Sequence, residues 1–125
     1  MIDWDKVRYF TREEFGESLG MSPDPELVGK LDEARHLASK WAGRPVPFII
    51  TSGIRPHDTT VVGLQSAHVT GQAVDLRAWT SRDRFYILKA LFAVGFSRIG
   101  IYDKHIHADV SRIHDRDVVW TGESR

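Results

Sequence analysis

Apolar residues along the chain follow helical spacing in two segments. Residues 22–43 carry apolar side chains three and four positions apart, and Ser22 and Pro23 supply a helix start. A second helix is predicted after Thr80, which opens a capping pattern, and it ends at Gly95. Such stripes are typical of helices that pack on a core. The stripe residues are Leu27, Leu31, Ala34, Ala38 and Trp41 in the first helix and Phe85, Leu88, Leu91 and Phe92 in the second.

A shorter helix is predicted nearer the N-terminus. Thr11 and Glu14 form a capping-box pattern, and each is flanked by a phenylalanine in the arrangement of a hydrophobic staple. We expect this helix to run to about Ser18 and to end at Gly20.

Short apolar or alternating runs predict the strands. They lie at residues 48–51, 73–77, 98–102 and 105–110, with a candidate edge strand at 118–120. Residues 53–72 are typical of a loop, and a loop of this length in a small domain is more often functional than not. The sequence therefore predicts an α+β fold, a small, mainly antiparallel sheet with two or three helices packed on one face.

Alternation within two of these strands brings polar side chains to one face. In the strand at residues 73–77, Asp75 points away from its two aliphatic neighbours. In the later strand His105, His107 and Asp109 share a face, opposite an apolar set. If the apolar sides face the helices, Asp75 and the two histidines lie together on the outer face of the sheet.

His68 completes a candidate metal site. It precedes Asp75 by seven residues, and Gly71 lets the chain turn back over the sheet. Two imidazoles and one carboxylate are a ligand set of catalytic zinc, with water as fourth ligand. Taken singly, these residues have simpler explanations: an exposed loop histidine, a solvated strand face, or an ion pair between Asp75 and Arg77.

Composition bounds the function classes. The 125 residues predict one domain over 1–125, and 17 basic side chains balance 17 acidic ones, which argues against a nucleic-acid partner. The absence of Cys excludes thiolate metal sites and cysteine nucleophiles. No apolar run approaches the ~20 residues of a membrane span, and the first residues do not form a signal peptide. We expect a monomer that is made in the cytoplasm and has no membrane partner.

The ordered motifs resemble the zinc D-alanyl-D-alanine metallocarboxypeptidases. Residues 66–76, with the pattern His-x-x-Gly-x-Ala-x-Asp, resemble their first zinc motif, and residues 106–110 resemble the second. Residues 51–56 and 95–102 are similar to the segments that precede each motif in the family. The wider group includes phage endolysins that cleave L-alanyl-D-glutamate bonds and the hedgehog signalling domain. The resemblance implies this hedgehog-type peptidase fold.

Carried over to this chain, the resemblance implies a role for each matching residue. Arg55 would bind substrate or stabilise charge on the scissile carbonyl, with an ion pair to Asp58 as the alternative. Ser66 would orient His68 or contact substrate. The zinc ligands implied are His68, Asp75 and His107.

One position departs from the family pattern. Many relatives carry a general-base Glu three residues before the last ligand histidine, where this chain has Lys104. His105 is the best substitute, because it shares a strand face with His107; it remains open whether it is instead a bystander or a further ligand. Asp103 and Asp109 are alternative bases, and Asp109 has the further possibility of orienting a ligand imidazole.

The sequence thus predicts a zinc-dependent peptidase that acts on the stem peptide of bacterial peptidoglycan, as a carboxypeptidase or as an endolysin. It would act at the cell wall, as a phage, prophage or bacterial protein. Two alternatives remain: a non-catalytic, zinc-containing binding or phage structural module, which the missing Glu favours, and a metal-free domain. Trp79 and Trp120 are expected to pack in the core, with a substrate groove as the alternative.

Overall fold

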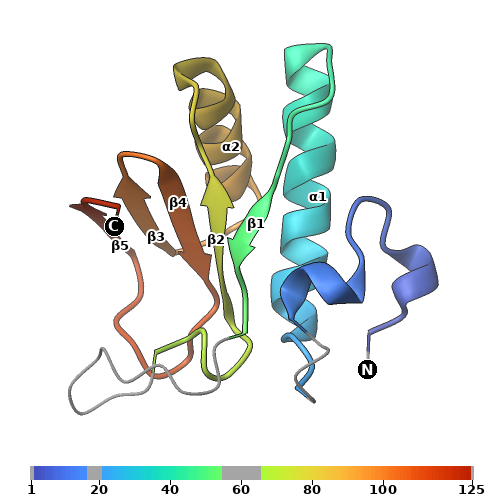
Figure 1. The fold of residues 1–125 in the computed structure, drawn as a ribbon, viewed down its shortest axis with the longest axis vertical. Coiled ribbons are helices and arrows are strands. Elements are labelled where there is room, and N and C mark those ends of the chain that lie inside the picture. The colour runs from blue at the N-terminus through green and yellow to red at the C-terminus, as the bar shows by residue number, and fades with distance from the viewer. Residues whose placement is uncertain (1, 17–20, 55–65, 125) are drawn as a thin grey trace.

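The architecture was derived from a computed structural model, which describes residues 2–16, 21–54 and 66–124 (Figure 1). No helix in these ranges is long and apolar enough to span a membrane. The elements in chain order are η1 (Trp4–Lys6), η2 (Arg12–Phe15), α1 (Pro25–Ala42), β1 (Ile50–Ser52), β2 (Ala73–Arg77), α2 (Ser81–Ala93), β3 (Arg98–Tyr102), β4 (His105–Asp109) and β5 (Val118–Gly122).

The five strands form one sheet in the order β1-β2-β4-β3-β5. The pairs β1–β2, β2–β4 and β3–β4 are antiparallel, whereas β5 joins β3 in parallel. The helices α1 and α2 pack against each other beside the sheet (Figure 1). The α+β fold with a small, mainly antiparallel sheet is therefore confirmed.

The core lies between the helices and the apolar face of the sheet. Leu76 in β2 and Ile106 in β4 are fully buried and lie opposite each other across the β2–β4 pair. From α1 the core takes Leu27, Leu31, Ala34 and Ala38, as the stripe predicts, and from α2 it takes Ile87, Ala90 and Leu91.

Three aromatic residues assigned to these stripes are not in the core. Trp41 is 37% exposed, Phe85 59% and Phe92 50%. In α2 the buried positions lie on the face of Ile87 and Leu91. A helix with apolar residues on more than one face does not reveal from its spacing which face is buried, and here smaller side chains pack inward.

The helix ends differ from the prediction at two places. α1 begins at Pro25 and not at Pro23, because the Asp24 carboxylate caps it by accepting a hydrogen bond from Glu26 N at 2.8 Å. The N-terminal element is a short 3-10 helix, which ends at Gly16 with φ of 83°. Ser18 and Gly20 lie outside the described residues.

Two glycines allow close contacts between the N-terminal segment and the metal-motif side of the sheet. A Cβ on Gly53 would lie 2.7 Å from the carbonyl oxygen of Phe15, and one on Gly71, where φ is 72°, would lie 2.8 Å from that of Ser22. Only glycine fits contacts this close without a backbone shift. The N-terminal 3-10 helix and the segment before α1 therefore contact the chain before the first metal motif and within it.

Candidate metal centre

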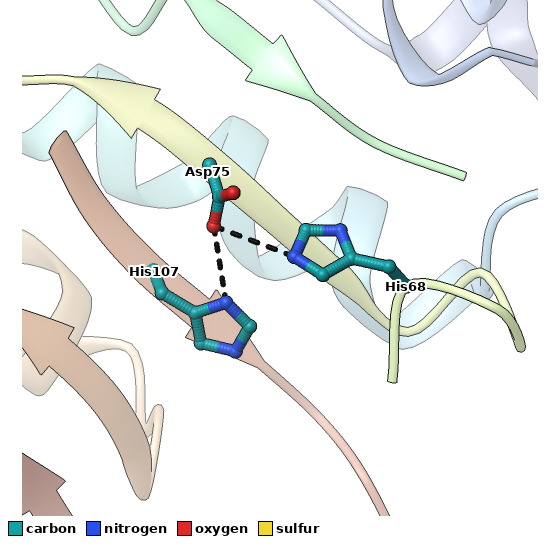
Figure 2. A group of neighbouring side chains, drawn as sticks. All are labelled: His68, Asp75 and His107. Carbon is teal, nitrogen blue, oxygen red and sulfur yellow. Dashed lines mark hydrogen bonds and ion pairs between the residues drawn. The ribbon is translucent and has the colours of Figure 1, made fainter. Parts of the chain in front are cut away.

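The register of β2 and β4 brings two candidate ligands together. Asp75 lies directly opposite His107 in the antiparallel pair, and both project from the face opposite the buried Leu76 and Ile106. His68 comes from the turn that precedes β2, and its ring reaches over the same carboxylate (Figure 2).

The three side chains converge within metal-binding distance. Asp75 Oδ1 lies 3.4 Å from His68 Nε2 and 3.1 Å from His107 Nδ1. One ligand atom from each residue falls within 4.8 Å of the others, and the two rings meet edge to face with centroids 5.1 Å apart. The structure therefore forms a His-Asp-His site from the three residues that the motifs indicated.

His68 is held in a ligand-ready tautomer by the backbone. Its Nδ1 lies 2.8 Å from the carbonyl oxygen of Gly53, and because a carbonyl can only accept, Nδ1 must carry the proton. Nε2 then has a free lone pair. That atom is buried and has no hydrogen-bond partner, although buried polar atoms nearly always have one. A cation between Nε2 and Asp75 would satisfy it, so the donor set fits a metal ion.

His107 is oriented from the opposite side of its ring. Its Nε2 lies 2.6 Å from Asp109 Oδ2, while Asp109 Oδ1 accepts from Arg98 Nε at 2.8 Å and from Ser111 N at 3.0 Å. With its Nε2–H donated to Asp109, His107 directs the lone pair of Nδ1 towards Asp75. The structure thus places Asp109 behind a candidate ligand, the orienting position that the sequence left open.

The electrostatics keep the Asp75 carboxylate ionised before metal binds. Burial raises its pKa, but the facing His107 and His68 side chains, which donate to the carboxylate when they are protonated, outweigh burial and hold that pKa well below its usual value. For His107, burial lowers the pKa, and the hydrogen bonds to Asp109 and Asp75 more than compensate and raise it. A proton and a metal ion therefore compete for His107, so metal affinity should fall at acidic pH.

His105 shares the outer face of the sheet but not the ligand cluster. Its ring stacks on Tyr102 at 4.2 Å and 11°, and its Nδ1 lies 2.7 Å from Ser124 Oγ. Burial lowers the pKa of His105, so the imidazole is mainly neutral at neutral pH. Among the described residues, His105 does not belong to the cluster formed by His68, Asp75 and His107.

The remaining site residues that the sequence indicated lie at different places in the structure. Arg55 lies outside the described residues, as does its alternative partner Asp58. Ser66 is buried, and its hydroxyl accepts from His68 N at 3.2 Å, a contact suited to orienting the ligand turn. Lys104, at the position of the family Glu, is exposed.

The two tryptophans do not pack in the core as expected. Trp79 is 71% exposed, with the Arg77 guanidinium 4.1 Å from its ring centroid. Trp120 is half-buried on the metal face, where its ring centroid lies 5.3 Å from that of His107. The expectation of core packing is wrong for Trp79, because a cation–π contact covers one face of its ring at the surface.

Several supporting residues were missed by sequence reasoning. They act through partners far along the chain: the Gly53 carbonyl on His68, Arg98 on Asp109, and Ser124 on His105. Gly53 and Arg98 lie within the family-like segments 51–56 and 95–102, but those segments do not indicate which side chain each residue contacts. Only Arg98 carried a signal, since it alternates onto the same face of its strand as Gly100 and Tyr102.

The Peptidase M15 family model matches residues 8–109 of this chain. The chain belongs to the M15 peptidase family. No curated protein and no solved structure matches the chain. As an M15 peptidase, the chain is a metallopeptidase, and among the described residues the His-Asp-His cluster is a group whose donor atoms could hold a metal ion. The matched region includes all three cluster residues together with His105 and Asp109.

Proposed function

We propose that this M15 peptidase uses zinc to hydrolyse a peptide bond in the stem peptide of bacterial peptidoglycan. The observation that supports the metal chemistry is His68 Nε2, a buried nitrogen that has no hydrogen-bond partner and lies 3.4 Å from Asp75 Oδ1. The family assignment supports peptide hydrolysis. The peptidoglycan substrate rests on the resemblance of the motifs to D-alanyl-D-alanine carboxypeptidases and endolysins.

The donor set favours zinc over harder cations. His68, Asp75 and His107 offer two imidazole nitrogens and one carboxylate oxygen, whereas magnesium and calcium prefer all-oxygen sites. Three protein ligands are also the number that leaves a catalytic zinc one open position. When bound, zinc would polarise the scissile carbonyl and lower the pKa of water at that position.

His105 is the proton carrier in this proposal. It lies on the strand face of His107, two residues away, and burial keeps it mainly neutral, so a ring nitrogen can accept a proton from the attacking water. The same imidazole then donates the proton to the leaving amine. Lys104, at the position of the family Glu, supplies no carboxylate that could take this role.

A carboxylate of the substrate, or the oxyanion that forms on the scissile carbonyl, would be stabilised by a cationic side chain near the metal. Arg55 is the candidate, because a guanidinium binds a carboxylate or an oxyanion with two parallel hydrogen bonds. The role is carried over from the family motif at residues 51–56. Acting on the cell wall as a phage, prophage or bacterial enzyme, the chain would meet this substrate as a monomer.

The experiment is mass spectrometry of peptidoglycan fragments after incubation with the purified chain, with and without a zinc chelator. Chelator-sensitive loss of a terminal D-Ala establishes a carboxypeptidase. Chelator-sensitive cleavage between L-Ala and D-Glu establishes an endopeptidase of the endolysin type. Wild-type protein with zinc bound and every muropeptide intact would refute the proposal.

His105→Ala tests the proton carrier. A general base contributes about 10²–10⁴-fold, so we expect kcat to fall by that factor while zinc remains bound. Zinc content measured on the same sample separates the two roles, because loss of zinc would make His105 a ligand. Lys104→Ala is a matched control from the adjacent, exposed position, and we expect it to keep both zinc and activity.

A non-catalytic zinc module is the second candidate, because Lys104 replaces the family Glu. It predicts stoichiometric zinc and binding of muropeptides without cleavage. The fragment analysis separates the two candidates directly.

A further inference from the structure

The segment after β5 reaches the proposed proton carrier. Ser124 Oγ lies 2.7 Å from His105 Nδ1 and accepts from Lys104 N at 3.2 Å. The backbone N–H of Ser124 donates to Asp103 Oδ1 at 2.5 Å. One serine therefore joins the turn between β3 and β4 to the side chain of His105. In Figure 1 the C-terminal end lies beside β5 and the β3–β4 pair.

The proton of the Ser124 hydroxyl has one favoured direction. A hydroxyl donates once and accepts twice, and one acceptor position is used by Lys104 N. The neighbouring Asp103 carboxylate can only accept, and hydrogen bonds to an ionised oxygen are about twice as strong as neutral ones. Hydrogen bonds from the backbone and the hydroxyl of Ser124 lower the pKa of Asp103, which keeps it ionised. With its proton directed to Asp103, Ser124 Oγ can only accept from His105.

We propose that Asp103 and Ser124 are positioning residues that fix His105 as the Nδ1–H tautomer and leave the lone pair on Nε2 to accept the proton. The inference rests on the proposed role of His105 in hydrolysis. It goes further by assigning which ring nitrogen acts and which residues determine that choice.

The surrounding contacts fix the plane of the His105 ring as well. Tyr102 stacks on it at 4.2 Å and 11°, and the Tyr102 hydroxyl in turn accepts from Trp120 Nε1 at 2.9 Å. Trp120 also lies against His107. The ring of His105 is thus held by its face through Tyr102 and by its edge through Ser124, so neither rotation nor tautomer exchange is free.

The first test reads the tautomer directly. The full chain, loaded with zinc and labelled with ¹⁵N, is studied by NMR above the pKa of His105, where ring nitrogen shifts distinguish Nδ1–H from Nε2–H. We expect the Nδ1–H form for His105 in the wild type. In Ser124→Ala we expect a shift towards the Nε2–H form, and in Ser124→Thr, which keeps a hydroxyl, a return of the wild-type signature.

The second test follows turnover. In Ser124→Ala we expect kcat to fall roughly 10- to 100-fold, the range for partners that orient an imidazole in a metal site, with KM little changed. Asp103→Asn should lower kcat in the same direction, because an amide can donate to Ser124 and reverse the hydrogen bond to His105. Ser124→Thr should restore kcat. Glu123→Gln, an exposed neighbour, is the control that leaves the hydroxyl in place and should match the wild type.

The outcomes separate this inference from the proposed function. A wild-type His105 with its proton on Nε2 overturns the tautomer assignment, even if the enzyme is fully active. A proton on Nδ1 that is lost in Ser124→Ala supports the assignment, even if no muropeptide is cleaved and the proposed function fails. Equal kcat in the wild type and in a folded Ser124→Ala would overturn the positioning role.

Discussion

Replacing Asp109 with Asn should weaken zinc binding without changing a ligand. Asp109 accepts a 2.6 Å hydrogen bond from His107 Nε2 and a 2.8 Å one from Arg98 Nε, and it is only 2% exposed. Asn keeps the shape and one acceptor oxygen but removes the negative charge. The His107 imidazole is then held less firmly, and its Nδ1 becomes a weaker donor to the metal.

The expected magnitude follows from the hydrogen bond that changes. Bonds to charged groups contribute about 1.5–3 kcal/mol and neutral ones about 0.5–1.5 kcal/mol, so the loss at His107 is about 1–1.5 kcal/mol. This corresponds to roughly a tenfold weaker zinc affinity, at the lower end of the 10–100-fold typical of residues that support metal ligands. Competition with a chromophoric chelator for zinc measures it at neutral pH.

Asp32→Asn is the matched control. Asp32 is another buried carboxylate, 7% exposed, whose oxygens accept from the backbone of Arg8 and Tyr9. We expect Asp32→Asn to lower the melting temperature and leave zinc affinity unchanged. The reasoning is refuted if Asp109→Asn binds zinc as tightly as the wild type. Equal losses of affinity in both variants would attribute the effect to general stability and refute it equally.

Three further predictions concern stability. Burial raises the pKa of Asp24, but its ion pair with Arg112 holds that pKa below its usual 3.8, so the pair stabilises the fold above that value. Unfolding by urea between about pH 7 and pH 3 should show the advantage of the wild type over Asp24→Asn shrinking as pH falls through the lowered pKa. Gly53→Ala should cost about 1–3 kcal/mol in the same assay and weaken zinc binding, because its Cβ meets Phe15 O and shifts the carbonyl that holds His68. Chelating the zinc should lower the melting temperature, because zinc at a free concentration of 1,000 times its Kd stabilises the fold by about 4 kcal/mol. His68→Ala should not respond to the chelator.

Alternation predicted the sheet well because burial enforces it. The strand at Ala73–Arg77 was predicted with its observed bounds, since a polar Asp75 between two aliphatic residues fits only a half-buried strand. The start of α1 was predicted two residues early, because both Ser22-Pro23 and Asp24-Pro25 are valid helix starts. Contacts with the segment of Gly71, remote in sequence, decide between them, and local patterns do not contain that information.

In the candidate site, too, some residues could be predicted from local sequence and others could not. His68, Asp75 and His107 could be predicted because motif spacing and strand alternation together place them on one face. The partners of these residues could not, because the parallel pairing of β5 with β3 brings Trp120 and Ser124 to the site from a distant segment. A three-residue apolar run indicates a strand but not its neighbour or its direction.

The cross-strand pairing of Asp75 with His107 ties the metal centre to the core. The neighbouring pair in the same ladder is Leu76 with Ile106, and both are fully buried. A slip of one residue would put the two ligands into the apolar layer and the two aliphatic side chains into solvent. Folding of the sheet therefore already brings Asp75 and His107 together, so the loss of conformational entropy needed to assemble these two ligands occurs before a metal ion binds. A metal ion would therefore bind a pre-organised pair of ligands, unlike the small zinc modules in which the metal must drive folding.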